Sequence, residues 1–167
     1  MADWVPAPSS SASETLSDAE THEGLEPDEE LRARARVSFR GALGATSRST
    51  LSMAAGRTRM RAFDAWESTA RAAGFPTAGP EMLLGVTDRR LVVWRTSFFL
   101  ARPLDIADDM PVERIVDVSA MRHGLVTGLA FVLETGAIVE VESMRNRRLQ
   151  HLARAIAAAV AERRGGA

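Results

Sequence analysis

The chain has 167 residues, of which 46% are hydrophobic and 26% are charged, a composition typical of one globular domain with a real core. It contains no cysteine, which excludes disulfide bonds, thiol nucleophiles and cysteine-ligated metal sites. All 21 basic residues are arginine, which excludes lysine-based catalysis. Three histidines and no tyrosine leave little scope for general acid–base chemistry.

The net charge of −1 at pH 7 conceals two blocks of opposite sign. Residues 1–30 carry nine acidic residues and no arginine, whereas residues 31–167 carry all 21 arginines and have a net charge of +8. Because residues 1–30 also have few large apolar side chains, we predict that they form a disordered acidic tail. This tail lacks the features of a secretory signal, and no window is apolar enough to span a membrane, so we expect a cytoplasmic protein.

The first predicted element covers residues 31–41, which alternate apolar and polar residues with the period of a β-strand. Alanine and arginine are also good helix formers, so a helix stays open as the alternative for this segment. Residues 51–73 repeat apolar residues at helical spacing and predict an inserted helix. Gly74, Phe75 and Pro76 fit the end of that helix, because glycine takes the left-handed position and proline cannot continue a helix.

From residue 81 the pattern changes to short strands separated by turns. Strands are predicted over residues 82–87, 91–96, 98–102, 112–121, 129–134 and 137–142. The first two and the last two form hairpins, the second of them around Thr-Gly at 135–136. The acidic, proline-bounded segment 104–111 predicts a solvated loop. Trp94 and Phe131 fall at inward-facing strand positions and are expected in the core.

The last element is an amphipathic helix predicted over residues 146–164, with one apolar stripe formed by Leu149, Leu152, Ile156 and Val160. Together the elements predict a mixed α+β, mainly β fold. This fold is a small antiparallel barrel of seven strands, capped by the C-terminal helix, with an extra helix inserted after the first strand. We expect the domain to span residues 31–164, with its β core over 81–142.

Two short motifs precede the closing helix: Leu-Leu-Gly-Val-Thr-Asp-Arg-Arg-Leu-Val-Val-Trp-Arg at 83–95 and Pro-Val-Glu-Arg-Ile at 111–115. With that helix, they resemble the bacterial pleckstrin-homology-like (PH-like) domains over about residues 80–160. The composition also fits a bacterial, GC-rich genome of actinobacterial type, since alanine and arginine abound beside a single asparagine, Asn146, and a single glutamine, Gln150. The resemblance implies a seven-stranded barrel and a binding or scaffolding role, and it supplies no ligand.

The candidate ligand-binding residues are four arginines of the first strand, Arg32, Arg34, Arg36 and Arg40. A strand projects alternate residues to one side, so these four are expected to form a row. Such a row suits phosphates, acidic peptides or the acidic tail of the chain itself, and a merely solvated strand face is the alternative. We also form the hypothesis that the tail interacts with the arginine-rich segment 31–63 of the same chain.

Three other patterns are candidate sites. Asp105, Asp108, Asp109 and Glu113 offer carboxylates to a hard cation, but their spacing matches no EF-hand, so no metal is expected. His123 lies in a turn, with no nucleophile or carboxylate placed beside it by sequence, so no catalytic residue is expected. The glycine-containing segment 41–47 lacks the lysine of a phosphate loop and is expected to be a turn, and no cofactor is expected.

These patterns favour a non-enzymatic PH-like module that binds a protein or an anionic surface. We expect a protein partner, with weak contacts to anionic lipid or polyanion. Two alternatives stay open. One is a small enzyme that uses His123 and the acidic segment, and the other is a polyanion or nucleic-acid binder that uses the arginine-rich segment 32–61. Nucleic acid is not the expected partner, because this segment has few aromatic residues for base stacking.

Overall fold

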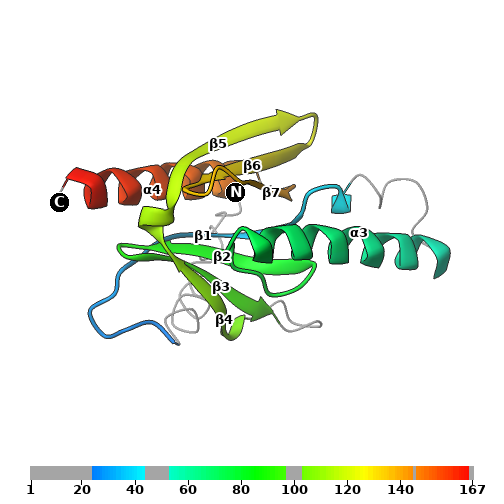
Figure 1. The fold of residues 1–167 in the computed structure, drawn as a ribbon, viewed down its shortest axis with the longest axis horizontal. Coiled ribbons are helices and arrows are strands. Elements are labelled where there is room, and N and C mark those ends of the chain that lie inside the picture. The colour runs from blue at the N-terminus through cyan, green and yellow to red at the C-terminus, as the bar shows by residue number, and fades with distance from the viewer. Residues whose placement is uncertain (1–23, 44–52, 97–102, 145, 166–167) are drawn as a thin grey trace, which may run out of the picture.

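The computed structural model describes residues 24–43, 53–96, 103–144 and 146–165 (Figure 1). Its seven strands are β1 (Leu31–Phe39), β2 (Glu81–Thr87), β3 (Arg90–Thr96), β4 (Pro103–Pro111), β5 (Ile115–His123), β6 (Val126–Leu133) and β7 (Ile138–Ser143). They form one antiparallel sheet in the order β4-β3-β2-β1-β7-β6-β5. Within these described ranges β4 and β5 are unpaired edges, so the sheet is open where a closed barrel was expected.

Strand β1 joins the two halves of this sheet. It pairs with β2 from Leu31 opposite Thr87 to Ser38 opposite Glu81, but its pairing with β7 covers only Ser38 and Phe39. The short β1–β7 ladder lets the half formed by β5, β6 and β7 turn away from the half formed by β1 to β4, as Figure 1 shows. The core lies between the two halves.

The period-2 pattern of β1 decides between the two predictions for its segment. Ala33, Ala35 and Val37 are buried, whereas Arg32, Arg34 and Arg36 lie on the more exposed face. A strand places alternate residues on opposite faces, while a helix would have carried the same arginines around its circumference. The strand prediction is therefore confirmed.

Helix α4 (Asn146–Gly165) packs against β1, β2, β5 and β6 and so covers both halves of the sheet. Leu149, Leu152 and Ile156 are fully buried, and Val160 is nearly so. The predicted apolar stripe is thus the face of α4 that closes the core, and the prediction of a C-terminal capping helix is confirmed. Neither α4 nor the other helix within the described part of the chain is long and apolar enough to cross a membrane.

Helix α3 (Met53–Ala72) is the predicted insertion between β1 and β2. It ends at the predicted place, where Gly74 has a φ of 74°. The N–H of Phe75 donates to the carbonyl of Ala70 at 2.9 Å, and the N–H of Gly74 donates to the carbonyl of Arg71 at 2.9 Å. This pair of bonds is the Schellman motif, which satisfies the last carbonyls of a helix. Phe63 and Trp66 pack on Phe39 with ring centroids 5.6 and 6.3 Å away, which fixes α3 beside the end of β1.

The acidic segment after residue 103 corrects one prediction. We expected a loop over 104–111, whereas the structure forms β4 there, paired with β3. Proline is tolerated at the ends of an edge strand, and the acids of β4 face arginines of β3, as in the ion pair between Arg95 and Asp105. The strand expected at 98–102 lies outside the described residues. The strand expected from residue 112 begins three residues later, after a 3-10 turn, η1 (Val112–Arg114).

The inward-facing aromatic residues are where the pattern placed them. Trp94 on β3 is 1% exposed and Phe131 on β6 is fully buried. Phe131 contacts Phe75, which follows α3, with ring centroids 4.9 Å apart. The prediction that both residues belong to the core is confirmed.

Candidate binding site

The four arginines expected as a binding row are engaged inside the chain. Arg32 forms an ion pair with Glu162 of α4 at 2.6 Å, Arg36 approaches Glu81 of β2 at 3.9 Å, and Arg40 pairs with Glu140 of β7. Arg34 also has an interaction partner. The row exists as a strand face, and acids from α4, β2 and β7 partly neutralise it, so ligand binding by this row stays a prediction.

The residues of the enzyme alternative lie on different elements. Asp105, Asp108 and Asp109 belong to β4, where Asp109 pairs with Arg90 at 2.8 Å and Asp108 accepts the Thr77 N–H at 3.2 Å. His123 is the last residue of β5, at the opposite edge of the sheet. Within the described residues no group of three acidic or histidine side chains is arranged to hold a metal ion.

The end of the acidic segment departs from the predicted tail. Residues 24–30 are described, and Glu26, Asp28 and Glu29 form ion pairs with Arg89 in the β2–β3 turn and Arg90 at the start of β3. The Glu30 N–H donates to the Asp88 carboxylate, and the Asp88 N–H donates to the Glu30 carbonyl, which completes the contact. These arginines lie outside the segment 31–63, so the hypothesis that the tail interacts with that segment stays a prediction. Residues 1–23 lie outside the described part.

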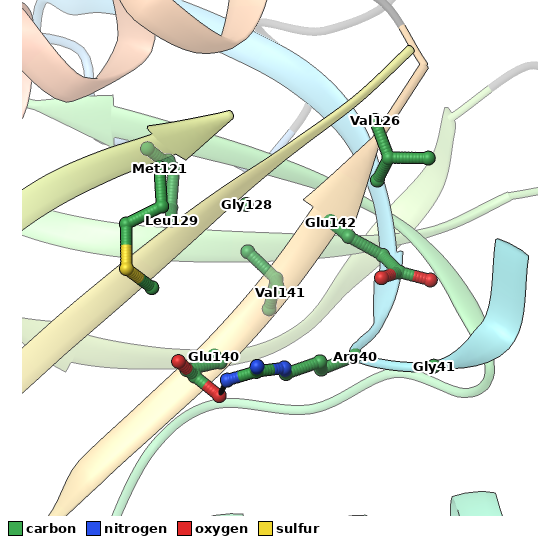
Figure 2. A pocket seen from close by; sticks show the side chains of 9 residues that line it. All are labelled: Arg40, Gly41, Met121, Val126, Gly128, Leu129, Glu140, Val141 and Glu142. Atoms are coloured by element: carbon green, nitrogen blue, oxygen red, sulfur yellow. Dashed lines mark hydrogen bonds and ion pairs between the residues drawn. The ribbon is translucent and has the colours of Figure 1, made fainter. Parts of the chain in front are cut away.

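A hollow on the face of β5, β6 and β7 is the candidate binding site (Figure 2). Its volume is about 320 Å³, within the range of small ligand sites. It is lined by Arg40, Gly41, Met121, Val126, Gly128, Leu129, Glu140, Val141 and Glu142. The strands supply an apolar wall, and one guanidinium and two carboxylates lie among the lining groups.

The hollow exists because Gly128 has no side chain. In the sheet, Gly128 lies opposite Met121 on β5 and opposite Glu142 on β7, so the three residues form one row on the same face. A Cβ atom at Gly128 would meet only the carbonyl oxygens of Val141 at 3.6 Å and Met121 at 3.8 Å, which is ordinary contact. Packing does not require glycine there, and its side-chain volume is left open.

The pair of Arg40 and Glu140 separates this hollow from a second one. Both residues, with Gly41, also line a hollow of about 440 Å³ that reaches Trp66 on α3 and Ile138 on β7. Trp66 holds this part of β7 in place, because its indole N–H donates to the Glu140 carbonyl at 2.9 Å. The hydrogen bond to the Glu140 carboxylate raises the pKa of Arg40, so its guanidinium stays charged at this boundary.

The second carboxylate of the hollow belongs to Glu142, which is 8% exposed. Its Oε1 accepts the N–H of Leu43, just after β1, at 2.6 Å. Among the residues that the structure describes, no arginine forms an ion pair with Glu142, and Arg40 is held by Glu140. Glu142 is therefore a largely buried carboxylate with a single hydrogen bond from the described part of the chain.

Comparison of the chain with protein-family models gives no match, and comparison with curated proteins gives none either. The geometry of the hollow is therefore the basis for assigning a role. The sequence indicated one of its lining residues, Arg40, as a candidate, and it missed Gly128 and Glu142.

A signal for the missed residues was present in the sequence. An isolated glycine within a strand pattern often marks close approach of another group, and Gly128 lies within β6, ahead of the predicted strand start. Glu140 and Glu142 alternate with Val139 and Val141 along the second hairpin, and both glutamates line the hollow. The sequence pattern does not predict the register between β6 and β7, which places Glu142 opposite Gly128.

Proposed function

We propose that this chain is a non-enzymatic PH-like binding module whose partner is a protein. The seven antiparallel strands and the C-terminal helix support this proposal, although the sheet is open where the resemblance implies a closed barrel. The motifs that carry the resemblance fall in the β2–β3 hairpin and at the start of β5.

One observation carries the proposal: the apolar hollow over Gly128. Its volume of about 320 Å³ suits one inserted side chain better than a large cofactor, and its wall is mainly apolar with a few charged groups that would orient a ligand. Partner side chains that fill such pockets dominate the binding energy of many interfaces. In this proposal the partner inserts a side chain over Gly128, between Met121 and Glu142.

The proposal is tested by filling the hollow. Gly128→Leu adds a side chain where a Cβ meets only ordinary contacts, so the sheet is expected to fold and the hollow to be occupied. Gly165→Leu adds the same side chain to the exposed end of α4 and is the matched control. Proteins retained from a bacterial lysate by the unchanged chain and by Gly165→Leu, but lost with Gly128→Leu, would be the partners. Retention of every bound protein by a folded Gly128→Leu variant would disprove this site.

A further inference from the structure

The carboxylate of Glu142 defines the chemistry of the hollow. It is 92% buried, lines the hollow, and accepts one hydrogen bond, at Oε1, from Leu43. Figure 2 shows its side chain extending from β7 toward Gly41 at the end of β1, beside Val126. Burying a carboxylate is costly unless charge or hydrogen bonds compensate it. Among the residues that the structure describes, none is recorded as donating to the second oxygen of Glu142, which leaves that oxygen for a donor from another molecule.

The charges at the rim favour a cation. Arg40 is engaged by Glu140, and Glu142 acts on Arg40 at longer range, as its smaller contribution to the raised pKa of Arg40 indicates. One guanidinium, that of Arg40, therefore lies near two carboxylates, those of Glu140 and Glu142. These three groups together carry a net negative charge. A positively charged ligand group would balance it, and in a partly desolvated site the attraction is stronger than in water.

The wall of the hollow fits the stem of such a group. Met121 and Val126 supply apolar side chains on the same face of the sheet as Gly128, beside the open space over it. Long cationic side chains bury their methylene stems on apolar surface and keep the charge at the tip. The lining of the hollow includes both parts of this arrangement, an apolar surface and a carboxylate.

The geometry points to a lysine side chain of the partner protein, with its ammonium on Glu142 and its stem on the apolar wall; this inference rests on the proposed function. Arginine fits less well, because its planar fork binds a carboxylate through both oxygens, and Oε1 of Glu142 is already engaged by Leu43. An ammonium is a compact point charge and needs only one open oxygen. The chain contains no lysine, so another copy of this chain cannot supply this group.

The test uses three small molecules that share an n-butyl chain and differ in their polar group. Backbone amide NMR of the full chain would be followed at Val126, Gly128 and Glu142 during titration with n-butylammonium, n-butanol and n-butylguanidinium. A hydrogen bond to a charged group predicts that butylammonium binds about tenfold more tightly than butanol, and that added salt reduces this ratio. Butylguanidinium should bind more weakly than butylammonium.

Two variants localise the effect. Glu142→Gln keeps an oxygen for the Leu43 N–H but removes the charge, so butylammonium and butanol should then bind equally. Glu113→Gln removes an exposed carboxylate in η1 and should leave the tenfold ratio unchanged. If Glu142→Gln does not fold, the ratio of the two probes on the unchanged chain still decides.

Different results would disprove the lysine inference and the proposed function. Butanol binding over Gly128 as tightly as butylammonium would overturn the lysine inference and leave the binding hollow in place. Tighter binding of butylguanidinium than of butylammonium would also overturn it. If no probe shifts these amides and Gly128→Leu retains every partner, the hollow is not the binding site and the proposed function loses its site.

Discussion

The carboxylate of Glu29 lies against the guanidinium of Arg90 with no solvent exposure of the Glu29 side chain. Arg90 donates from Nε at 2.8 Å and from Nη2 at 2.7 Å, and the Thr87 hydroxyl donates to the same carboxylate at 2.7 Å. This contact attaches the acidic segment before β1 to the turn between β2 and β3. The pairing lowers the pKa of Glu29 to about 2, chiefly through the hydrogen bonds from Arg90.

Replacing Glu29 should therefore destabilise the fold. Glu29→Gln keeps the shape of the side chain but leaves Arg90 with a neutral partner, and the expected loss in free energy of unfolding is about 1–3 kcal/mol. Urea unfolding followed by tryptophan fluorescence measures it. Glu134→Gln, which removes an exposed partner of Arg114, is the control and should cost less. Equal losses in the two variants would show that burial of Glu29 contributes nothing.

The stability contributed by Glu29 should depend on pH in a defined window. Its pKa falls from 4.5 when unfolded to about 2 when folded, so this contribution is complete above about pH 4.5 and is lost as the pH falls toward 2. In that window the unfolded chain binds more protons, and stability falls by at most about 1.4 kcal/mol per pH unit. The difference in unfolding free energy between the unchanged chain and Glu29→Gln should be smaller at pH 3 than at pH 6. A difference that is the same at both pH values would contradict the lowered pKa.

Replacing Gly56 within α3 and Gly74 just after it by alanine should change the stability of the fold in opposite directions. Gly74 has a φ of 74°, and a Cβ there would lie 2.6 Å from Nη2 of Arg114, so Gly74→Ala should cost roughly 1–2 kcal/mol or more. Gly56 lies within the helix with open space around it, so Gly56→Ala should stabilise by roughly 0.5–1 kcal/mol. Thermal melting measures both. A melting temperature unchanged by Gly74→Ala would show that the left-handed position is not required.

The role of α4 as part of the core is open to a direct test. Leu152→Ala or Ile156→Ala should each cost about 2–5 kcal/mol, because both side chains are fully buried between the helix and the sheet. His151→Ala, at an exposed position of the same helix, should change stability little. A chain that ends at Met144 should fail to fold. Cooperative melting of that shortened chain at the original temperature would disprove the assignment.

Local rules were sufficient for the helices and for most strands. The end of α3 followed from Gly74, Phe75 and Pro76 alone, because a helix terminus is satisfied by groups within a few residues of it. The buried face of α4 followed from the spacing of its apolar residues, since period determines which residues share a face. The alternation along β1 likewise predicted its buried and exposed sides.

Strand β4 required the tertiary structure. Its acids and its two terminal prolines have the local signals of a loop, and the segment becomes a strand only because β3 presents backbone partners and arginines such as Arg95 beside it. The order of the strands, and therefore the open sheet, was also not contained in any one segment. Both depend on contacts between residues that are distant in sequence.

The candidate site was decided almost entirely by tertiary structure. Arg40 was visible as part of a cationic strand, but its pairing with Glu140 depends on where β1 meets β7. The open space over Gly128 and the hydrogen bond from Leu43 to Glu142 follow from strand register and from the return of the chain after β1. Composition and period thus determined the elements and their buried faces, because those depend on neighbours along the chain. The sheet order and the hollow depend on which strands come together, and only the folded chain decides that.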